Sequence, residues 1–167
     1  MTHSNSCLNP MPQLILLSIL MSFCQIASAD PQVLGWQETV YFTDEQLFAE
    51  AKIDTGADHS SLHALNIEPF EKNDQAWVRF ELLGQKTLER PVLKNSVIKA
   101  KTALQAASVR PVIALQLCFA GQKRVVQFNL VNRQHLKVPV LIGRADMPKG
   151  WLVNPHQTHL VSTDCRL

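Results

Sequence analysis

The chain has 167 residues, of which 46% are hydrophobic and 18% are charged. Its 16 basic and 14 acidic side chains leave a formal net charge of +2, with no cluster of basic residues. Nucleic-acid-binding domains concentrate positive charge on one surface, so this composition argues against a nucleic-acid partner.

The first segment has the pattern of a signal peptide. Residues 14–26 form an apolar run that is too short to cross a bilayer, and residues 27–29 (ASA) follow with small side chains at the first and third positions. We therefore expect residues 1–29 to be removed. Residues 30–167 are then expected to be one periplasmic or secreted domain, with no membrane attachment and too few residues for two lobes.

The most informative motif is residues 51–58 (AKIDTGAD), an apolar strand that runs into an Asp-Thr-Gly loop. Asp54 offers a carboxylate, Thr55 a hydroxyl that can bond to a partner loop, and Gly56 a backbone that turns tightly without a Cβ. The loop resembles the one that presents the catalytic carboxylate in pepsin-type and retroviral-type aspartic proteases. The alternative is an ordinary strand-turn with an Asx-type hydrogen bond at Asp54.

Strand patterns dominate the rest of the chain. Apolar and polar residues alternate in three segments: 78–82, 113–119 and 126–130. A turn at Gly121-Gln122 predicts that the last two form a hairpin. Regularly spaced prolines leave little room for long helices, and only residues 43–50 and 102–107 could be helical by composition. These patterns predict one all-β domain, a closed or nearly closed barrel of short strands.

Two cysteines remain after the expected cleavage, Cys118 and Cys165. In an oxidising compartment they would join the C-terminal tail to a long strand. Two isolated thiols remain the alternative, because a bridge requires the two Cβ atoms within about 4.5 Å and a sequence does not show this.

Several motifs follow one another as they do in a bacterial family of retropepsin-like aspartic peptidases, often labelled an "ATP-dependent zinc protease". They are 35–38 (GWQE), 51–57 (AKIDTGA), 60–64 (SSLHA), 77–80 (WVRF), 110–113 (RPVI), 132–133 (NR) and 139–144 (PVLIGR). The resemblance implies a barrel of the retropepsin (acid protease) type. It also implies catalytic residues Asp54, Thr55 and Gly56, supported by Ala57, Asp58, Gly143 and Arg144.

The resemblance implies an aspartic-type peptidase or amide hydrolase acting on a peptide or amide substrate. Aspartic catalysis needs two carboxylates that share one proton, and each chain has one Asp-Thr-Gly. A homodimer is therefore expected to bring Asp54 against its counterpart, one carboxylate acting as general base on water and the other as general acid. The retropepsin pattern also implies that Asp58 pairs with Arg144.

The family's label does not fit the residues. The six glycines never form a phosphate-binding loop, and His-Glu-x-x-His is absent. His59 and His63 have a spacing that can chelate zinc on a helix, but no third ligand is spaced to complete a site. We therefore expect neither a metal nor any other cofactor, with one histidine at the surface and one packed beside the Asp54 loop.

A second function class stays open. Residues 97–109 correspond by position to the flap that closes over substrate in retropepsins, yet they contain no glycine and suit a plain exposed hairpin equally well. The alternative to an enzyme is a non-catalytic periplasmic binding or interaction domain on the same scaffold. Similar proteins are linked with ATP-grasp amino-acid ligases, which would make the substrate an amide or a short glutamyl tail.

Overall fold

The computed structural model describes residues 31–98 and 108–165. These residues form β-strands with one short 3-10 turn. The elements are β1 (Val33–Phe42), β2 (Leu47–Asp54), β3 (Ser60–Lys72), β4 (Gln75–Leu82), β5 (Lys86–Pro91), β6 (Lys94–Ile98), β7 (Ser108–Phe119), β8 (Gln122–Val131), β9 (Val140–Gly143), η1 (Arg144–Asp146) and β10 (Leu152–Thr158).

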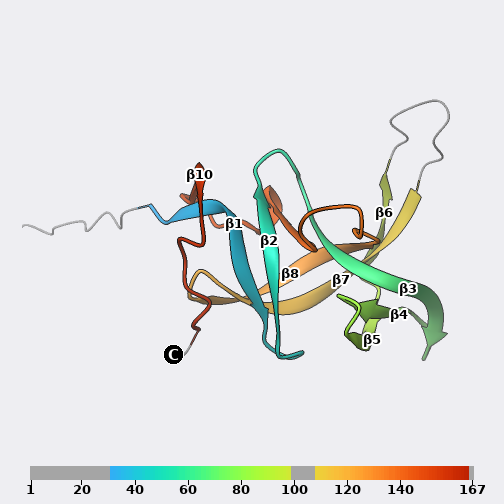
Figure 1. The fold of residues 1–167 in the computed structure, drawn as a ribbon. Helices are drawn as coiled ribbons and strands as arrows, with labels where there is room; N and C mark the ends of the chain where they lie inside the picture. Colours follow the sequence, from blue (N-terminus) through green and yellow to red (C-terminus); the bar gives the residue numbers. More distant parts are fainter. Residues whose placement is uncertain (1–30, 99–107, 166–167) are drawn as a thin grey trace, which may run out of the picture. The chain divides into compact units, whose positions relative to one another are not determined.

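Six strands close into a barrel in the order β1-β2-β9-β3-β8-β7, and the pairing of β7 with β1 completes the ring (Figure 1). The closing contact is short, with Tyr41 opposite Cys118 and Phe42 opposite Leu117. Outside the ring, β10 pairs with β1, β6 with β7, and the β4–β5 hairpin with the second half of β3. The expected all-β closed barrel is confirmed.

The expected alternation produces the core. Val78, Phe80 and Leu82 point inward on β4, as do the apolar members of the alternating runs on β7 and β8. β7 and β8 form the expected hairpin, but its turn residues are Ala120 and Gly121 rather than Gly121 and Gln122, because Gln122 is the first residue of β8 and pairs with Phe119. Both turn residues have positive φ, the conformation of the tight two-residue turn that matches strand twist.

The possible helix at residues 43–50 was a wrong prediction. The structure has a turn at 43–46 and then β2, whose Ala49, Ala51 and Ile53 face the core while its intervening residues do not. Period-two burial and pairing with β1 outweigh a composition that suits a helix. Residues 102–107, the other possible helix, and most of the candidate flap lie outside the described residues.

A buried carboxylate on β1 holds the C-terminal segment. Glu38 is fully buried, and its side chain accepts hydrogen bonds from the backbone N–H groups of Gly35, Leu160 and Val161 at 2.5, 3.0 and 3.4 Å. Gly35 must be glycine, because an added Cβ would lie 2.6 Å from the carbonyl oxygen of Gln157. The GWQE motif therefore builds a structural contact beside β10.

The structure resolves the cysteine question in favour of a bridge. Cys118 on β7 and Cys165 form a disulfide, with Cα atoms 5.8 Å apart and a sequence separation of 47. The bridge closes a long loop that includes β8, β9 and β10. Closing such a loop restricts the unfolded chain more than the folded one.

Reduction of this bridge should lower the free energy of unfolding by about 2–4 kcal/mol, because the unfolded state regains the entropy of the open loop. Urea unfolding with and without reductant measures the difference. The double variant Cys118→Ser/Cys165→Ser serves as the control and should not respond to reductant. Equal stability of the oxidised and reduced wild type would contradict the expectation.

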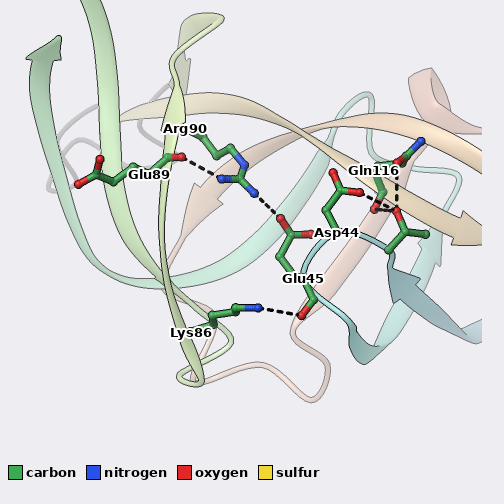
Figure 2. Close-up of polar contacts among 7 residues, drawn as sticks. Asp44, Glu45, Lys86, Glu89, Arg90 and Gln116 are labelled. Carbon is green, nitrogen blue, oxygen red and sulfur yellow. Dashed lines mark hydrogen bonds and ion pairs between the residues drawn. The ribbon is translucent and has the colours of Figure 1, made fainter.

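A buried ion pair attaches the β4–β5 hairpin to the barrel (Figure 2). Arg90 on β5 donates to Oε1 of Glu45 at 2.5 Å, and Lys86 donates to the Glu45 backbone carbonyl at 3.2 Å. Only 1% of the Glu45 side chain is exposed. Its other oxygen, Oε2, has no hydrogen-bond partner among the described residues, so the carboxylate depends on Arg90.

Replacing Arg90 by Met should therefore destabilise the fold by about 3 kcal/mol, because it leaves a buried carboxylate without its counter-charge. The double replacement Glu45→Met/Arg90→Met should cost less than Arg90→Met alone, since no unpaired charge remains. Chemical denaturation of the three variants forms the cycle. A double variant that is less stable than Arg90→Met would contradict this account.

Candidate active site

The Asp-Thr-Gly loop is positioned by an unusual strand order. β2 and β3 are consecutive in the chain, yet β9 lies between them, parallel to β2 and antiparallel to β3. This register places Asp54, the last residue of β2, opposite Gly143, the last residue of β9. An added Cβ at Gly143 would lie 2.6–2.9 Å from backbone atoms of His59, so glycine allows the loop and β9 to touch.

The Asp54 carboxylate is partly exposed and paired on both oxygens. Lys52 Nζ lies 2.9 Å from Oδ2, and the Gly56 backbone N–H donates to Oδ1 at 3.0 Å. The hydrogen bond from Lys52 is the main cause of a lowered Asp54 pKa; the Gly56 bond and the charge of Lys52 add to it, and partial burial opposes it. The carboxylate is thus held ionised in the single chain.

Gly56 does not have a left-handed backbone, so its role is to leave room for the Asp54 side chain. An added Cβ at Gly56 would lie 3.2 Å from Asp54 Oδ1, which is closer than most Cβ contacts. Thr55 and Gly56 are both exposed at the tip of the loop. The Thr55 hydroxyl makes no hydrogen bond within the described part of the chain, so it stays available to a second molecule.

The expected pair of Asp58 and Arg144 is present. The Arg144 guanidinium contacts Asp58 Oδ1 and also donates to the Thr55 carbonyl at 2.5 Å. Backbone bonds from Arg144 and Ala145 to the carbonyls of Ala57 and Asp58 complete the contact between loop and η1. The Arg144 and Asp58 side chains are 51% and 75% exposed, so this is a surface ion pair worth about 0–1 kcal/mol.

Ser60 connects the residues that follow the Asp-Thr-Gly loop to β9 and η1. Its hydroxyl accepts from the Gly143 N–H at 3.0 Å and donates to Asp146 at 2.6 Å, while Asn129 donates to its carbonyl at 3.1 Å. Ser60 is fully buried. One hydroxyl therefore connects the start of β3 to β9 and η1.

A buried arginine lies behind the site. Arg133 is 7% exposed, donates Nη1 to the Ser61 hydroxyl at 2.7 Å and Nε to the Val138 carbonyl at 3.3 Å, and pairs with no carboxylate among the described residues. Burial and the nearby Arg110 lower its pKa, whereas the charge of Asp54 raises it. His63 accepts from the Arg133 backbone N–H at 2.9 Å, and burial with the Arg133 charge lowers the His63 pKa.

Three of these residues were not identified as site residues from sequence: Lys52, Ser60 and Arg133. Lys52 had a usable signal, because residues i and i+2 of a strand share a face and Lys52 stands two before Asp54. The Ser60 hydroxyl and the Arg133 guanidinium contact residues 83 and 72 positions away, Gly143 and Ser61, which no local pattern reveals. His59 is exposed and lies before β3, whereas His63 is within it.

The sequence profile of the family described as retropepsin-like aspartic endopeptidase RimB matches residues 33–163. The chain belongs to the RimB-like family. Its closed barrel is thus a retropepsin-like scaffold.

Relatives of this RimB-like chain include larger proteins. A protein of Parasynechococcus marenigrum named "Probable alpha-L-glutamate ligase" is 32% identical over 117 residues, which cover 66% of this chain and 25% of that protein. A protein of the same name from Desulfotalea psychrophila is 28% identical over 132 residues, 74% of this chain and 28% of that protein. The chain thus spans about a quarter of the length of these relatives.

A solved structure is also similar. The crystal structure of protein Lpg0085 of Legionella pneumophila, of unknown function, superposes with a TM-score of 0.65 at 28% sequence identity. The match covers 80% of this chain and 98% of that one.

Lys52→Met should raise the pKa of Asp54, because Lys52 stabilises the ionised carboxylate. The lowered pKa stabilises the fold above the unfolded value near 3.8, and this contribution disappears as pH falls through the folded-state pKa. The variant should therefore lose less stability below pH 4 than the wild type. Carboxyl NMR titration checks the pKa, with Lys123→Met as the matched control; an unchanged Asp54 titration would refute the pairing.

Proposed function

We propose that this protein is an aspartic-type peptidase or amide hydrolase that works as a homodimer. The observation that carries the proposal is the placement of Asp54 in an exposed Asp-Thr-Gly loop, opposite the Gly143–Arg144 turn of a closed RimB-like barrel. Backbone hydrogen bonds from η1 hold the loop in this position. Such preorganisation is what a reacting carboxylate requires.

The chemistry needs the second chain. A single chain supplies one carboxylate, which Lys52 keeps ionised. In the proposed dimer the Asp54 of the partner subunit would add a like charge, which opposes the effect of Lys52 and favours one proton shared by the pair. One carboxylate would then take a proton from the attacking water while the other protonates the substrate carbonyl oxygen.

We also propose that the bond hydrolysed involves glutamate. The support is indirect: the relatives that contain a similar segment within a longer chain are named "Probable alpha-L-glutamate ligase". A hydrolase of this specificity would cleave the kind of amide bond that such a ligase forms, and the export proposed below would place it in a different compartment from a cytoplasmic ligase.

Export completes the proposal. The leader pattern predicts a mature chain that begins at Asp30, in the periplasm or outside the cell. The Cys118–Cys165 disulfide supports an oxidising compartment, because structural disulfides are rare in the cytosol. N-terminal sequencing of periplasmic material decides where the chain is cleaved.

A second candidate is a non-catalytic binding domain on the same scaffold. The observation that favours it is the ion pair between Lys52 and Asp54. In a single chain this pair engages the only carboxylate of the Asp-Thr-Gly motif, so Asp54 would have a structural role. This candidate implies a monomer, no turnover at any pH, and ligand affinity little changed by Asp54→Asn.

The hydrolase proposal predicts that Asp54→Asn abolishes turnover of peptide or amide substrates without loss of stability, since Asn is nearly isosteric but cannot act as a base. Asp74→Asn is the matched control, because Asp74 is exposed in the β3–β4 turn with a positive φ that Asn also adopts. Activity should be highest at acidic pH, where the pair holds one proton, and should be unaffected by chelators.

Specific activity should also fall on dilution, because half of a shared site is inert. Sedimentation of the mature chain measures the association directly. A strictly monomeric protein at high concentration would leave the proposed mechanism without its second carboxylate and favour the binding domain.

A further inference from the structure

Arg133 presents an unusual combination of burial and charge. Arginine is almost never fully buried without a partner of opposite charge, because an uncompensated buried cation is costly. Its two hydrogen bonds go to neutral acceptors, the Ser61 hydroxyl and the Val138 carbonyl. The third guanidinium nitrogen, Nη2, donates no hydrogen bond to the described residues. It is also not one of the buried side-chain atoms that lack a hydrogen-bond partner, so Nη2 is accessible to solvent.

Arg133 also lines a pocket of about 340 Å³, near the lower end of the range for ligand sites. Lys52, Arg133 and Lys137 bring three cations to its lining, and no acidic residue lines it. Lys137 is exposed and makes no ion pair within the described ranges. The pocket therefore has an excess of positive charge over an otherwise apolar wall, formed by Trp36, Leu136, Val138 and Leu141.

The pocket is connected to the candidate catalytic carboxylate through Lys52, although Asp54 itself does not line it. Lys52 lines it and its Nζ contacts Asp54 Oδ2 at 2.9 Å, while Leu141, the register partner of Lys52 on β9, forms the adjacent wall. The negative charge of Asp54 also raises the pKa of Arg133. The Lys52 side chain thus connects the pocket to Asp54, which makes the pocket a candidate for the part of a substrate next to the bond being cleaved.

We infer that Arg133, Lys137 and Lys52 form a specificity pocket for a carboxylate of the substrate, next to the bond that Asp54 acts on. The inference rests on the proposed hydrolase function and adds the residues that select the substrate. Arginine suits the role because its planar fork can bind both carboxylate oxygens. The apolar wall would pack the aliphatic part of an acidic side chain. The same carboxylate chemistry occurs at the free C-terminus of a peptide.

Three matched peptides separate these sources by calorimetry on the full mature chain. Acetyl-Gln-Glu-Gln-amide carries one side-chain carboxylate, acetyl-Gln-Gln-Gln with a free terminus carries one terminal carboxylate, and acetyl-Gln-Gln-Gln-amide carries none. We expect one of the two charged peptides to bind roughly 10-fold or more tightly than the neutral one, as charge-assisted hydrogen bonds require. The tighter of the two identifies the source. Equal binding of all three, or no binding, would overturn the inference.

Arg133→Gln should remove the preference, and Lys137→Gln should reduce it at least about 3-fold. Lys137 is exposed, so its variant tests the pocket even if loss of the Ser61 and Val138 bonds unfolds Arg133→Gln. Lys123→Gln, an exposed lysine outside this pocket, is the control and should keep the full preference. A preference that survives in Lys137→Gln would also count against the inference.

Binding and turnover measurements distinguish a failure of the pocket inference from a failure of the hydrolase proposal. A protein that binds the carboxylate peptide selectively but hydrolyses no peptide keeps the pocket and loses the proposed hydrolase. A protein that hydrolyses Glu-containing and Gln-containing peptides with equal kcat/KM keeps the hydrolase and loses the pocket.

Discussion

The insertion of β9 between β2 and β3 is the constraint on which the rest of the structure depends. It pairs Gly143 with Asp54 in the strand register and places the end of β9 in contact with the backbone of His59. No side chain fits there, so a single glycine allows the three strands to meet. The Ser60 hydroxyl and the Arg144 backbone then bond across the same junction. The Asp-Thr-Gly loop is therefore anchored by hydrogen bonds on both sides of this crossing.

The electrostatic state of Asp54 follows from that position. A carboxylate at the end of β2 shares a strand face with Lys52, and the backbone of its own loop supplies the second donor. The single chain therefore holds an ionised Asp54 with cations on one side, Lys52 and Arg133. In the proposed dimer, a like charge from the second Asp54 would oppose the effect of these cations. The proposed catalysis would therefore depend on association through charge.

Local and motif patterns predicted much of the fold. Alternation at 78–82 and 113–119 placed buried and exposed residues on β4 and β7, and the Asp54 and Gly143 motifs meet as expected. The helix expected from composition at 43–50 failed because composition does not include the pairing of β2 with β1.

The remaining features depend on distance in space. The disulfide, the burial of Arg133 and the role of Ser60 each join residues 45 or more positions apart. The sequence left the cysteine bridge as one of two alternatives, and no local pattern indicated which partners Arg133 and Ser60 would contact. Arg133 shows this most clearly. An arginine in a polar stretch would ordinarily be assigned to solvent, yet the segment before β9 folds it against Ser61.

The buried Glu38 also has a consequence for how the chain reaches this fold. Its carboxylate accepts N–H groups from residues 122 and 123 positions away, and β1 gains its outer neighbour only from β10. Few of these contacts can form before nearly all of the domain has been synthesised. Proteins dominated by such distant pairings fold slowly, because loop closure costs entropy before contacts repay it. The proposed export would benefit from that delay, because the chain would still be unfolded when it reached the membrane.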